Sequence, residues 1–442
     1  MTRTTLAVGA LTVALAAAGL AVGYRFVEWD AGAGAETFPI TPPSEERHPD
    51  APGGQGFLYG RITTVGGTVH EGRIRFGGTG EAFWGDTFNG VKVENPWVAL
   101  VPEERRPTER RPIEILGLEI ADREHPVDLE RPFMARFGDI ARIEALGDEV
   151  RVTLKSGAVF DLDRWSASDF DDGVRVWDGG GRAVDLDSLR VRTIEFLATP
   201  ALGAAPYRLH GTVRTRQGEF SGFVQWGREK CVGSDDLIGR TVDGTMLRVR
   251  FDSVRSIERR SGAGSVVTLL DGREVALSAT ADVGEGNRGM YVDDRRYGRV
   301  LISWGAFERV DFGPGGSGPA YDEFPPGRPL RGSVTTRSGE RLFGRLVFDL
   351  DESETVETLD APFEGVDFTI PLDRVASIEP PGGRGWGASL ARVTLDEGDP
   401  LYLEPAGDLG AAHAGMLVLE GDAPGARYVP WSDVARIDFD RP

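Results

Sequence analysis

Three copies of one glycine-spaced phrase constrain the fold of this chain more than any other feature. The phrase "GTVRTRQGEFSGFVQW" begins at residue 211, and related phrases begin at residues 60 and 332. Apolar and polar residues alternate on both sides of a central glycine, which predicts two β-strands joined by a tight turn. The aligned glycines are Gly60, Gly67 and Gly72, then Gly211, Gly218 and Gly222, then Gly332, Gly339 and Gly344. We expect positive φ at the central glycines and close backbone approach at the outer ones.

Further landmarks follow this hairpin phrase in the same order in all three copies. Each copy has a Val-x-Leu strand signal, a turn glycine, an aspartate and a closing phenylalanine. These landmarks are Val152, Leu154, Gly157, Asp169 and Phe196; Val267, Leu269, Gly272, Asp282 and Phe312; and Val393, Leu395, Gly398, Asp408 and Phe439. A period of about 113 to 127 residues indicates duplicated domains rather than a short-period solenoid.

A shorter motif occurs twice within each copy. Apolar residues spaced by three precede an acidic residue, which predicts one tight helical turn that leads into a strand. The motif ends at Glu144, Glu195, Glu258, Asp311, Glu379 and Asp438. We interpret these acids as exposed strand positions, and the alternative is an acidic binding row.

A hairpin, a one-turn helix and a strand pair closed by an Asp-Gly type of turn together resemble the small SH3-like and Sm-like β-barrels. The resemblance is at the level of the fold and carries no functional residues. The content of 60 Gly and 27 Pro also favours many short strands. We therefore expect an all-β protein, with three tandem homologous domains of small-barrel or sandwich type after an N-terminal apolar helix. The alternative is a propeller-like ring made of the six half-repeats.

Two linkers that contain Pro and Gly set the expected domain limits. Residues 197–208 separate the first repeat from the second, and residues 313–329 separate the second from the third. The expected β-domains are residues 58–199, with an insertion near 91–128, residues 207–315 and residues 328–442. Ahead of them we expect a signal anchor or signal peptide at residues 1–24 and a flexible linker at residues 25–57.

The N-terminus carries the one targeting signal that we identify. Residues 5–24 contain no charged residue, and their length lies between that of a signal-peptide core and that of a spanning helix. The small residues Ala33, Gly34 and Ala35 resemble a cleavage site, but they lie well beyond the apolar run. We expect a retained membrane anchor with the globular part outside the cytoplasm, in the periplasm or the extracellular space. The alternative is secretion after cleavage.

Charge and residue types exclude several classes of function. The chain has 70 acidic and 50 basic residues and a formal net charge of −20, which repels nucleic acids and anionic lipid surfaces. Cys231 is the single cysteine, so no intrachain disulfide can form. The five histidines show no metal-ligand spacing, and no motif of a nucleophile elbow, P-loop, Rossmann fold or zinc protease occurs. The sequence therefore nominates no catalytic and no cofactor-binding residue.

One loop of the second repeat offers oxygen ligands. Asp282, Glu285 and Asn287 lie in "ADVGEGNRG" and have the chemistry that a hard cation such as Ca²⁺ prefers. The alternative is that Asp282 caps a turn through its side chain.

Three copies of one domain suit multivalent binding or spacing. We therefore expect a non-catalytic binding or scaffold protein of the bacterial cell envelope, with a protein or glycan partner there. The alternatives are a carboxylate-dependent envelope hydrolase and a cation-dependent structural protein.

Overall fold

The structure is a computed structural model. It describes residues 54–441 apart from residues 78–80, 107, 116–117, 127–130, 179–180, 203–206, 383–388, 398–399 and 422–424. The expected signal segment at residues 1–24 and most of the expected linker at residues 25–57 lie outside the described residues. Within the described ranges, no helix combines the length and the apolar character needed to cross a membrane.

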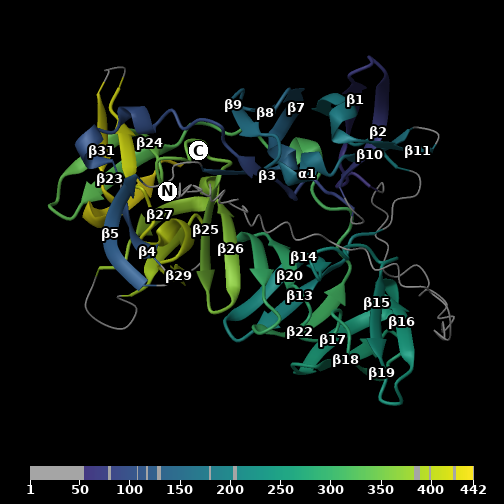
Figure 1. Ribbon diagram of the computed structural model, residues 1–442. Helices are drawn as coiled ribbons and strands as arrows, with labels where there is room; N and C mark the ends of the chain where they lie inside the picture. The colour runs from purple at the N-terminus through teal and green to yellow at the C-terminus, as the bar shows by residue number, and fades with distance from the viewer. Residues whose placement is uncertain are drawn as a thin grey trace, which may run out of the picture. The chain divides into compact units, whose positions relative to one another are not determined.

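The described chain is almost entirely β, which confirms the predicted fold class (Figure 1). The strands of the first repeat are β1 (Tyr59–Thr64), β2 (Val69–Phe76), β3 (Thr87–Val91), β4 (Thr108–Ile115), β5 (Leu118–Pro126), β6 (Pro132–Arg136), β7 (Ile140–Leu146), β8 (Glu149–Leu154), β9 (Val159–Asp163), β10 (Val174–Asp178), β11 (Ala183–Leu186) and β12 (Val191–Phe196). Its helical turns are η1 (Val98–Leu100), η2 (Glu103–Arg105), η3 (Phe137–Asp139), α1 (Ser168–Asp171) and η4 (Ser188–Arg190).

The second and third repeats contain the same kinds of element. The second has β13 (His210–Thr215), β14 (Gly218–Trp226), β15 (Asp236–Arg240), β16 (Met246–Arg250), η5 (Phe251–Ser253), β17 (Val254–Ser261), β18 (Gly264–Leu269), β19 (Glu274–Ser278), β20 (Met290–Asp294), β21 (Gly298–Ile302) and β22 (Phe307–Gly313), followed by η6 (Tyr321–Glu323) in the linker. The third has β23 (Arg331–Thr336), β24 (Arg341–Val347), β25 (Thr358–Phe363), β26 (Val366–Pro371), η7 (Leu372–Arg374), β27 (Val375–Glu379), β28 (Ala391–Leu395), β29 (Leu401–Leu403), η8 (Gly407–Leu409), β30 (Met416–Leu419), β31 (Ala426–Val429), η9 (Trp431–Asp433) and β32 (Val434–Phe439).

The second repeat shows the shared strand order in one antiparallel sheet. Its strands run β16-β15-β19-β18-β17-β22-β13-β14-β20-β21. The β17–β22 pair divides this order into two halves of five strands. In the first half, the hairpin β15–β16 leads through a tight turn into the central strand β17. In the second half, the hairpin β20–β21 leads in the same way into the central strand β22. Each half is a five-stranded antiparallel unit, and the first half is inserted between β14 and β20 of the second.

The first and third repeats keep this order in β11-β10-β2-β1-β12-β7-β8-β9 and in β29-β28-β27-β32-β23-β24-β30-β31. The remaining hairpin of each repeat, β3–β6 or β25–β26, lies outside that eight-stranded sheet. Among the described residues the large sheets have eight, twelve and eight strands rather than forming six separate blades, so the propeller-like alternative is wrong. The domain limits drawn from the linkers stay predictions.

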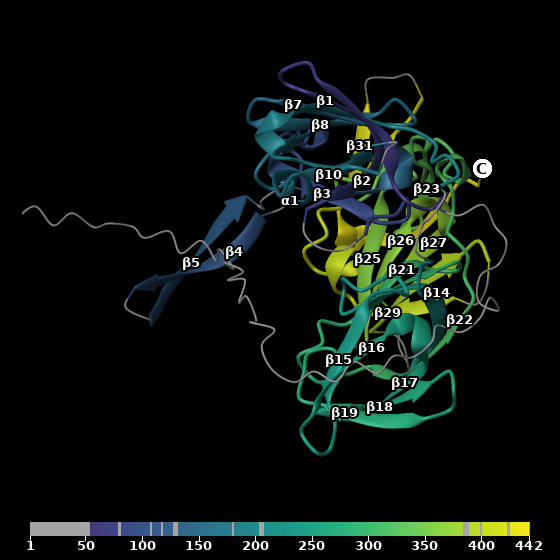
Figure 2. The ribbon, with the colours of Figure 1, turned by 90° about the vertical axis from the view of Figure 1, so that its right-hand side faces the viewer.

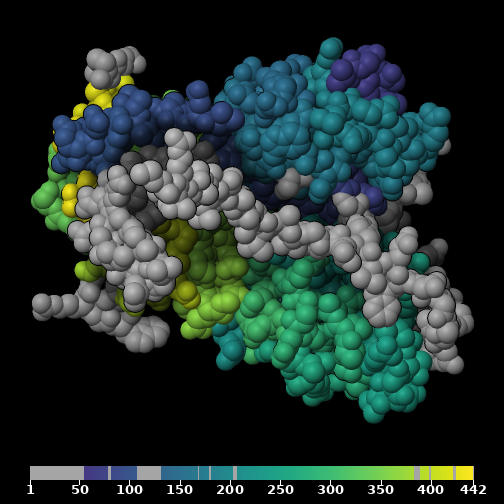
Figure 3. All heavy atoms as spheres, in the orientation of Figure 1, coloured from purple at the N-terminus to yellow at the C-terminus, as the bar shows by residue number. Residues whose placement is uncertain are grey.

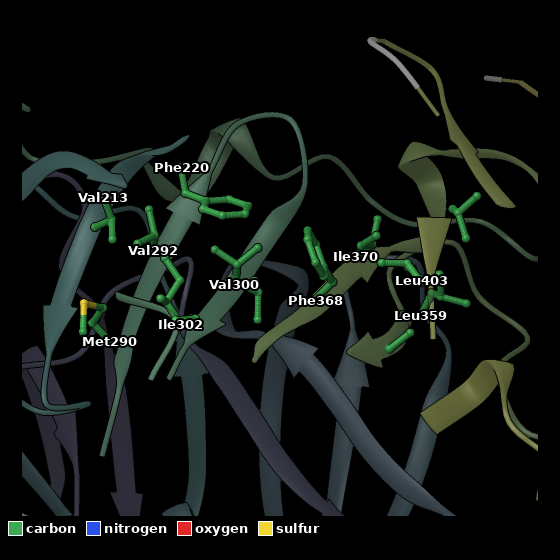
Figure 4. Close-up of a cluster of buried hydrophobic side chains, with 14 of the residues drawn as sticks. Val213, Phe220, Met290, Val292, Val300, Ile302, Leu359, Phe368, Ile370 and Leu403 are labelled. Carbon is green, nitrogen blue, oxygen red and sulfur yellow. The ribbon is translucent and has the colours of Figure 1, made fainter. Parts of the chain in front are cut away.

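The β25–β26 hairpin of the third repeat extends the sheet of the second repeat. Strand β26 pairs with β21, where Phe368 lies opposite Val300 (Figure 2). In the space-filling view the yellow-green hairpin lies against the green second repeat (Figure 3). The apolar side chains follow the same path, because the cluster around Val300 continues through Phe368 and Ile370 towards Leu403 (Figure 4). The second and third repeats thus share one core, whereas the first repeat has its own.

The expected roles of the glycines are confirmed. The central glycines Gly67, Gly218 and Gly339 have φ of 83°, 139° and 89°. A Cβ on Gly222 would lie 1.9 Å from the carbonyl oxygen of Asp293 on the neighbouring strand β20. At outer glycines such as Gly222, the hairpin strand lies so close to its neighbour that no side chain would fit.

Candidate functional site

The residues of the calcium hypothesis lie in one loop and have different surroundings. Asp282 Oδ2 accepts a hydrogen bond of 2.7 Å from the backbone N–H of Ile238 and forms an ion pair with Lys230. Asn287 donates from Nδ2 to the backbone carbonyl of Asp282 at 3.3 Å, and Glu285 is exposed. Across the described part of the chain, no group of three or more His, Cys, Asp or Glu side chains is arranged to hold a metal ion.

The recurrent aspartate has the same role in all three repeats. Asp169 Oδ2 accepts from the N–H of Asn89 at 3.3 Å, and Asp408 Oδ2 accepts from the N–H of Asp360 at 2.7 Å. These amides occupy the third position of β3 and β25, which is the position of Ile238 in β15. Capping of a strand amide therefore accounts for the recurrence of the aspartate, and calcium stays a proposal for the second repeat.

The acids at the ends of the helical-turn motif face arginines on the paired central strands. Glu258 and Asp311 lie 3.1 Å and 2.6 Å from nitrogens of Arg309. Arg436 has the same position between two acids in the third repeat. Because one arginine serves both acids, these positions form ion-pair ladders across the strands.

A hollow of about 820 Å³ lies where the three repeats meet, and we call it the junction hollow. Its walls come from the β3 and β6 region, from β14 and the β20–β21 turn, from linker residues 315–325, and from β25, β26 and η7. Four arginines line it, namely Arg136 of the first repeat, Arg295 and Arg299 of the second and Arg374 of the third, together with the acids Asp293, Asp294, Glu323 and Asp373. The volume falls within the range of about 300–1,000 Å³ that is typical of small-molecule sites.

Ion pairs between the repeats fix the walls of the junction hollow. Asp86 of the first repeat accepts from Gln225 Nε2 at 2.6 Å and pairs with Arg299 of the second. Arg299 also pairs with Asp293 at 2.9 Å, and Arg208, which is 2% exposed, reaches the same carboxylate at 3.2 Å. Salt screens such enclosed pairs less than it screens exposed ones.

Cation–π contacts hold the first linker against its neighbours, and hydrogen bonds hold the second. The Arg208 guanidinium lies 3.7 Å from the ring centre of Phe83 and 4.1 Å from that of Phe223. In the second linker, the backbone carbonyls of Tyr321 and Phe324 accept from Lys155 Nζ at 2.6 Å and 2.9 Å. These contacts hold both linkers at the wall of the junction hollow.

Two arginines of the junction hollow lie close enough to affect each other's charge. Burial and the neighbouring Arg136 lower the pKa of the Arg374 guanidinium, because two cations repel each other in a partly enclosed site. The carboxylate of Asp294 in the same wall is already paired with Arg296 at 2.8 Å. Arg295 is exposed at this wall. An added carboxylate would relieve the repulsion between the guanidinium groups.

The third repeat carries a buried acidic loop at residues 349–357, between β24 and β25. Lys92 of the first repeat enters this loop, and its Nζ donates to Asp351 Oδ1 at 2.8 Å and to Glu357 Oε1 at 2.7 Å. Burial opposes the charge of Lys92, but the Glu357 and Asp351 carboxylates outweigh burial and raise its pKa. The contact ties the first repeat to the third.

One acid of the loop has a structural role that the other repeats share. Glu357 Oε2 accepts from the backbone N–H groups of Ser353 and Glu354 at 2.7 Å and 2.9 Å. At the equivalent position Asp235 accepts from two backbone N–H groups, and Asp86 accepts from one. Asp349 and Glu354 are particular to the third repeat, whereas Glu352 aligns with Glu81 of the first repeat and Asp351 with Glu229 of the second.

Where the second repeat has an ion pair, the third repeat has two carboxyl groups at the aligned positions. Lys230, eight residues before Ile238, pairs with Asp282, whereas the position eight residues before Asp360 is Glu352. Burial, Asp351 and Asp408 raise the pKa of Glu352, and burial with Asp360 raises the pKa of Asp408. Both groups favour their neutral, protonated forms.

Two further carboxyl groups of this loop titrate near neutral pH. Burial raises the pKa of Asp349 to about 7, against the opposing charge of Arg131. Burial and Glu357 raise the pKa of Glu354 to about 7. Asp349 Oδ1 also lies 3.4 Å from Nδ1 of His413, and burial keeps that histidine in its neutral form by lowering its pKa.

Comparison with known protein families, with curated proteins and with solved structures finds no match for this chain. The candidate sites are therefore judged on their geometry. Sequence reasoning missed the junction arginines and the acidic loop. The signal for the loop was present, because aligning Lys230 with Glu352 exposes a reversal of charge at one repeat position.

Proposed function

We propose that this chain is a non-catalytic binding protein of the bacterial cell envelope whose junction hollow holds a carboxylate-bearing partner. The observation that carries the proposal is that Arg136, Arg295 and Arg374, one from each repeat, line the same hollow. Guanidinium groups suit carboxylates because their planar N–H donors can bind both oxygens at once. Four arginines and four acids line the hollow, so its charge is balanced in a chain whose net charge is −20.

The rigid walls support binding. The Asp86–Arg299 and Arg208–Asp293 pairs join the first two repeats and their linker, so a ligand meets groups that are already positioned. Preorganised groups lose little conformational entropy when the ligand arrives. On this proposal the three repeats build one site together.

The location in the envelope rests on the N-terminal sequence. Residues 5–24 carry no charge, and a spacer follows them. Full-length protein should therefore sediment with membranes, and a chain that starts near Gly56 should remain in the supernatant. Full-length protein found wholly in the cytosolic supernatant would contradict this part of the proposal.

The binding test uses a fluorescent peptide of alternating Glu and Ala and measures its anisotropy with the full chain. Arg295→Ala should weaken binding about tenfold, because a charge-assisted hydrogen bond contributes about 1.5–3 kcal/mol. Arg260→Ala is the matched control, since Arg260 is exposed and lies 3.5 Å from Glu258, away from the junction hollow. Equal affinities of the two variants, or no binding to the unaltered chain, would reject the junction hollow as the site.

A second candidate function is a carboxylate-dependent hydrolase of envelope polymers. It is favoured by Asp349 and Glu354, because carboxyl groups with pKa near 7 suit general acid–base catalysis. Release of soluble fragments from purified cell-wall polymer, lost in Glu354→Gln and retained in Glu397→Gln, would support this candidate. Fragment release at the same rate from both variants would remove the acidic loop from it.

A further inference from the structure

A second hollow, of about 420 Å³, lies between the first and third repeats, and we call it the acidic hollow. The first repeat contributes residues 92–97, Glu149 of β8 and residues 158–161 at β9. The third contributes Arg345 of β24 and three residues of the acidic loop, Asp351, Ser353 and Glu354. It shares no lining residue with the junction hollow.

Carboxylates outnumber cations around the acidic hollow. The lining acids are Glu94, Glu149, Asp161, Asp351 and Glu354, and the lining cations are Lys92 and Arg345. Lys92 is matched by Asp351 and Glu357, and Asp161 is matched by Arg151 at 2.7 Å. The remaining field in the hollow attracts a cation.

Glu354 is a buried acid of this wall whose side chain lacks a hydrogen-bond donor. Its side chain is 6% exposed, and Arg345 NH2 lies 3.8 Å away, which is beyond hydrogen-bond distance. Among the described residues no donor reaches its carboxylate, and Oε2 is fully enclosed. Asp351 Oδ2 is enclosed without a hydrogen bond in the same way. Buried carboxylates are normally satisfied, so a buried acid without a donor in the wall of a hollow points to a donor that comes from outside the chain.

The walls also offer the apolar surface that an organic cation needs. The Arg345 guanidinium lies 5.1 Å from the ring centre of Trp97, and Lys92 Nζ lies 5.1 Å from that of Phe160. Val159, which is 52% exposed, adds aliphatic surface to the lining. Aromatic faces beside carboxylates are a common means of binding ammonium groups.

We infer that the acidic hollow binds a primary alkylammonium group, with the Glu354 carboxylate as its hydrogen-bond acceptor. An ammonium group carries three N–H donors, so it can supply the donor that Glu354 lacks. The alkyl chain would lie along Val159 and Phe160. A small diamine and a lysine side chain of a partner peptide present the same group. The inference goes beyond the proposed function, because this site and the sign of its ligand are different.

The test measures binding of 1,5-diaminopentane and of a capped Gly-Lys-Gly peptide to the full chain by isothermal titration calorimetry at pH 8 and low salt. Capped Gly-norleucine-Gly is the neutral comparison. Both amines should bind, and the neutral peptide should not. Tighter binding of the peptide would identify a peptide-borne source, and tighter binding of the diamine a small-molecule source.

Three variants make the result specific to the acidic hollow. Glu354→Gln keeps the shape of the side chain and should weaken amine binding about tenfold. Val159→Lys places an ammonium group from an exposed position of the chain into the hollow and should abolish binding without disturbing the core. Glu397→Gln removes an exposed acid of the third repeat that does not line the hollow, and it should bind as the unaltered chain does.

The pH provides a further readout. Burial and Glu357 raise the pKa of Glu354 to about 7, and Arg345 opposes this effect. Amine affinity should therefore rise about tenfold from pH 6 to pH 8, as the carboxylate ionises, and should stay nearly constant in Glu354→Gln. The inference is overturned if neither amine binds at millimolar concentration, or if Glu354→Gln and Val159→Lys bind as tightly as Glu397→Gln. Failure here leaves the acidic-peptide test of the junction hollow unaffected.

Discussion

Replacement of Lys92 by methionine tests the contact between the first and third repeats most directly. The Lys92 side chain is 7% exposed, and its Nζ lies 2.8 Å from Asp351 and 2.7 Å from Glu357. Removing one partner of a buried ion pair costs about 3–5 kcal/mol, because the charge left behind stays desolvated. Lys92→Met leaves two such carboxylates, so we expect a loss of about 4–5 kcal/mol of local stability.

Hydrogen exchange resolved by residue is the suitable assay, since a chain of several repeats does not unfold in one step. Amides of residues 353–357 and of η7 in the third repeat should exchange about 10³–10⁴ times faster in Lys92→Met, because each 1.4 kcal/mol corresponds to a factor of ten. Arg61→Met is the exposed control. Arg61 is 45% exposed and lies 2.9 Å from Glu71, and loss of such a pair changes stability by about 0–1 kcal/mol.

The effect should also depend on pH with a defined sign. Burial raises the pKa of Asp351, and Lys92 opposes this rise. Without Lys92 the native Asp351 binds its proton more tightly than the unfolded chain does, so stability increases as pH falls. The defect should therefore shrink between pH 8 and pH 5. A loss in Lys92→Met no larger than that in Arg61→Met, or one that grows at low pH, would refute the argument.

Four further predictions follow from the geometry. Gly222→Ala should destabilise the second repeat by about 1–3 kcal/mol, because its Cβ would lie 1.9 Å from the carbonyl oxygen of Asp293. Gly218 has a φ of 139° and open space around it, so Gly218→Val should lower the free energy of unfolding by about 1 kcal/mol, as measured by chemical denaturation. Asp282→Asn should lower the thermal midpoint of the second repeat through loss of the Lys230 pair, and Ca²⁺ at one hundred times its Kd would add about 2.7 kcal/mol if the loop binds it; a wild-type midpoint equal in EDTA and in Ca²⁺ would end the calcium proposal. The third repeat should gain thermal stability as pH falls from 8 to 5, because native Asp349 and Glu354, with pKa about 7, hold protons more tightly than they do when unfolded, and Asp349→Asn combined with Glu354→Gln should flatten that profile.

The local features of the fold were predictable from sequence because they depend on neighbours in the chain. Alternation around Gly218 predicts the hairpin of β13 and β14, and the apolar spacing after Phe251 predicts the turn at Phe251–Ser253. Each pattern spans fewer than about ten residues, and within that length apolar residues that recur every second position are distinguishable from those that recur every third.

Pairing between repeats was not predictable in the same way. Nothing in the alternation of β26 states that Phe368 lies opposite Val300 of another repeat, because any strand of matching pattern could occupy that edge. The ion pair of Asp86 with Arg299 likewise joins positions 213 residues apart. The junction hollow depends on these distant contacts, so its arginines gave no local signal.

The role of Trp226, Trp304 and Trp431 shows how far burial could be inferred. Each occupies a repeat position that is otherwise apolar, which favours core packing, and Trp226 and Trp304 are 0% and 6% exposed. Trp431 is half-buried and stacks on His413 with ring centres 3.8 Å apart. Repeat position thus predicts the inward direction of a side chain, while the depth of burial depends on what the neighbouring segments contribute.

Repeats that share a fold make their differences informative. A carboxylate caps the turn before β3, β15 and β25 in every repeat. Its presence in all three repeats, as Asp86, Asp235 and Glu357, is explained by its role in holding that turn. Lys92 and the extra acids around Glu354 are departures from that common plan, and they occur in different repeats. Each departure would be costly by itself, since an unmatched buried charge destabilises a fold. They are tolerated together because Lys92 lies within hydrogen-bond distance of Asp351 and Glu357. The match covers one oxygen of each of these two acids, and Glu354 remains the surplus carboxylate that an ammonium ligand would neutralise.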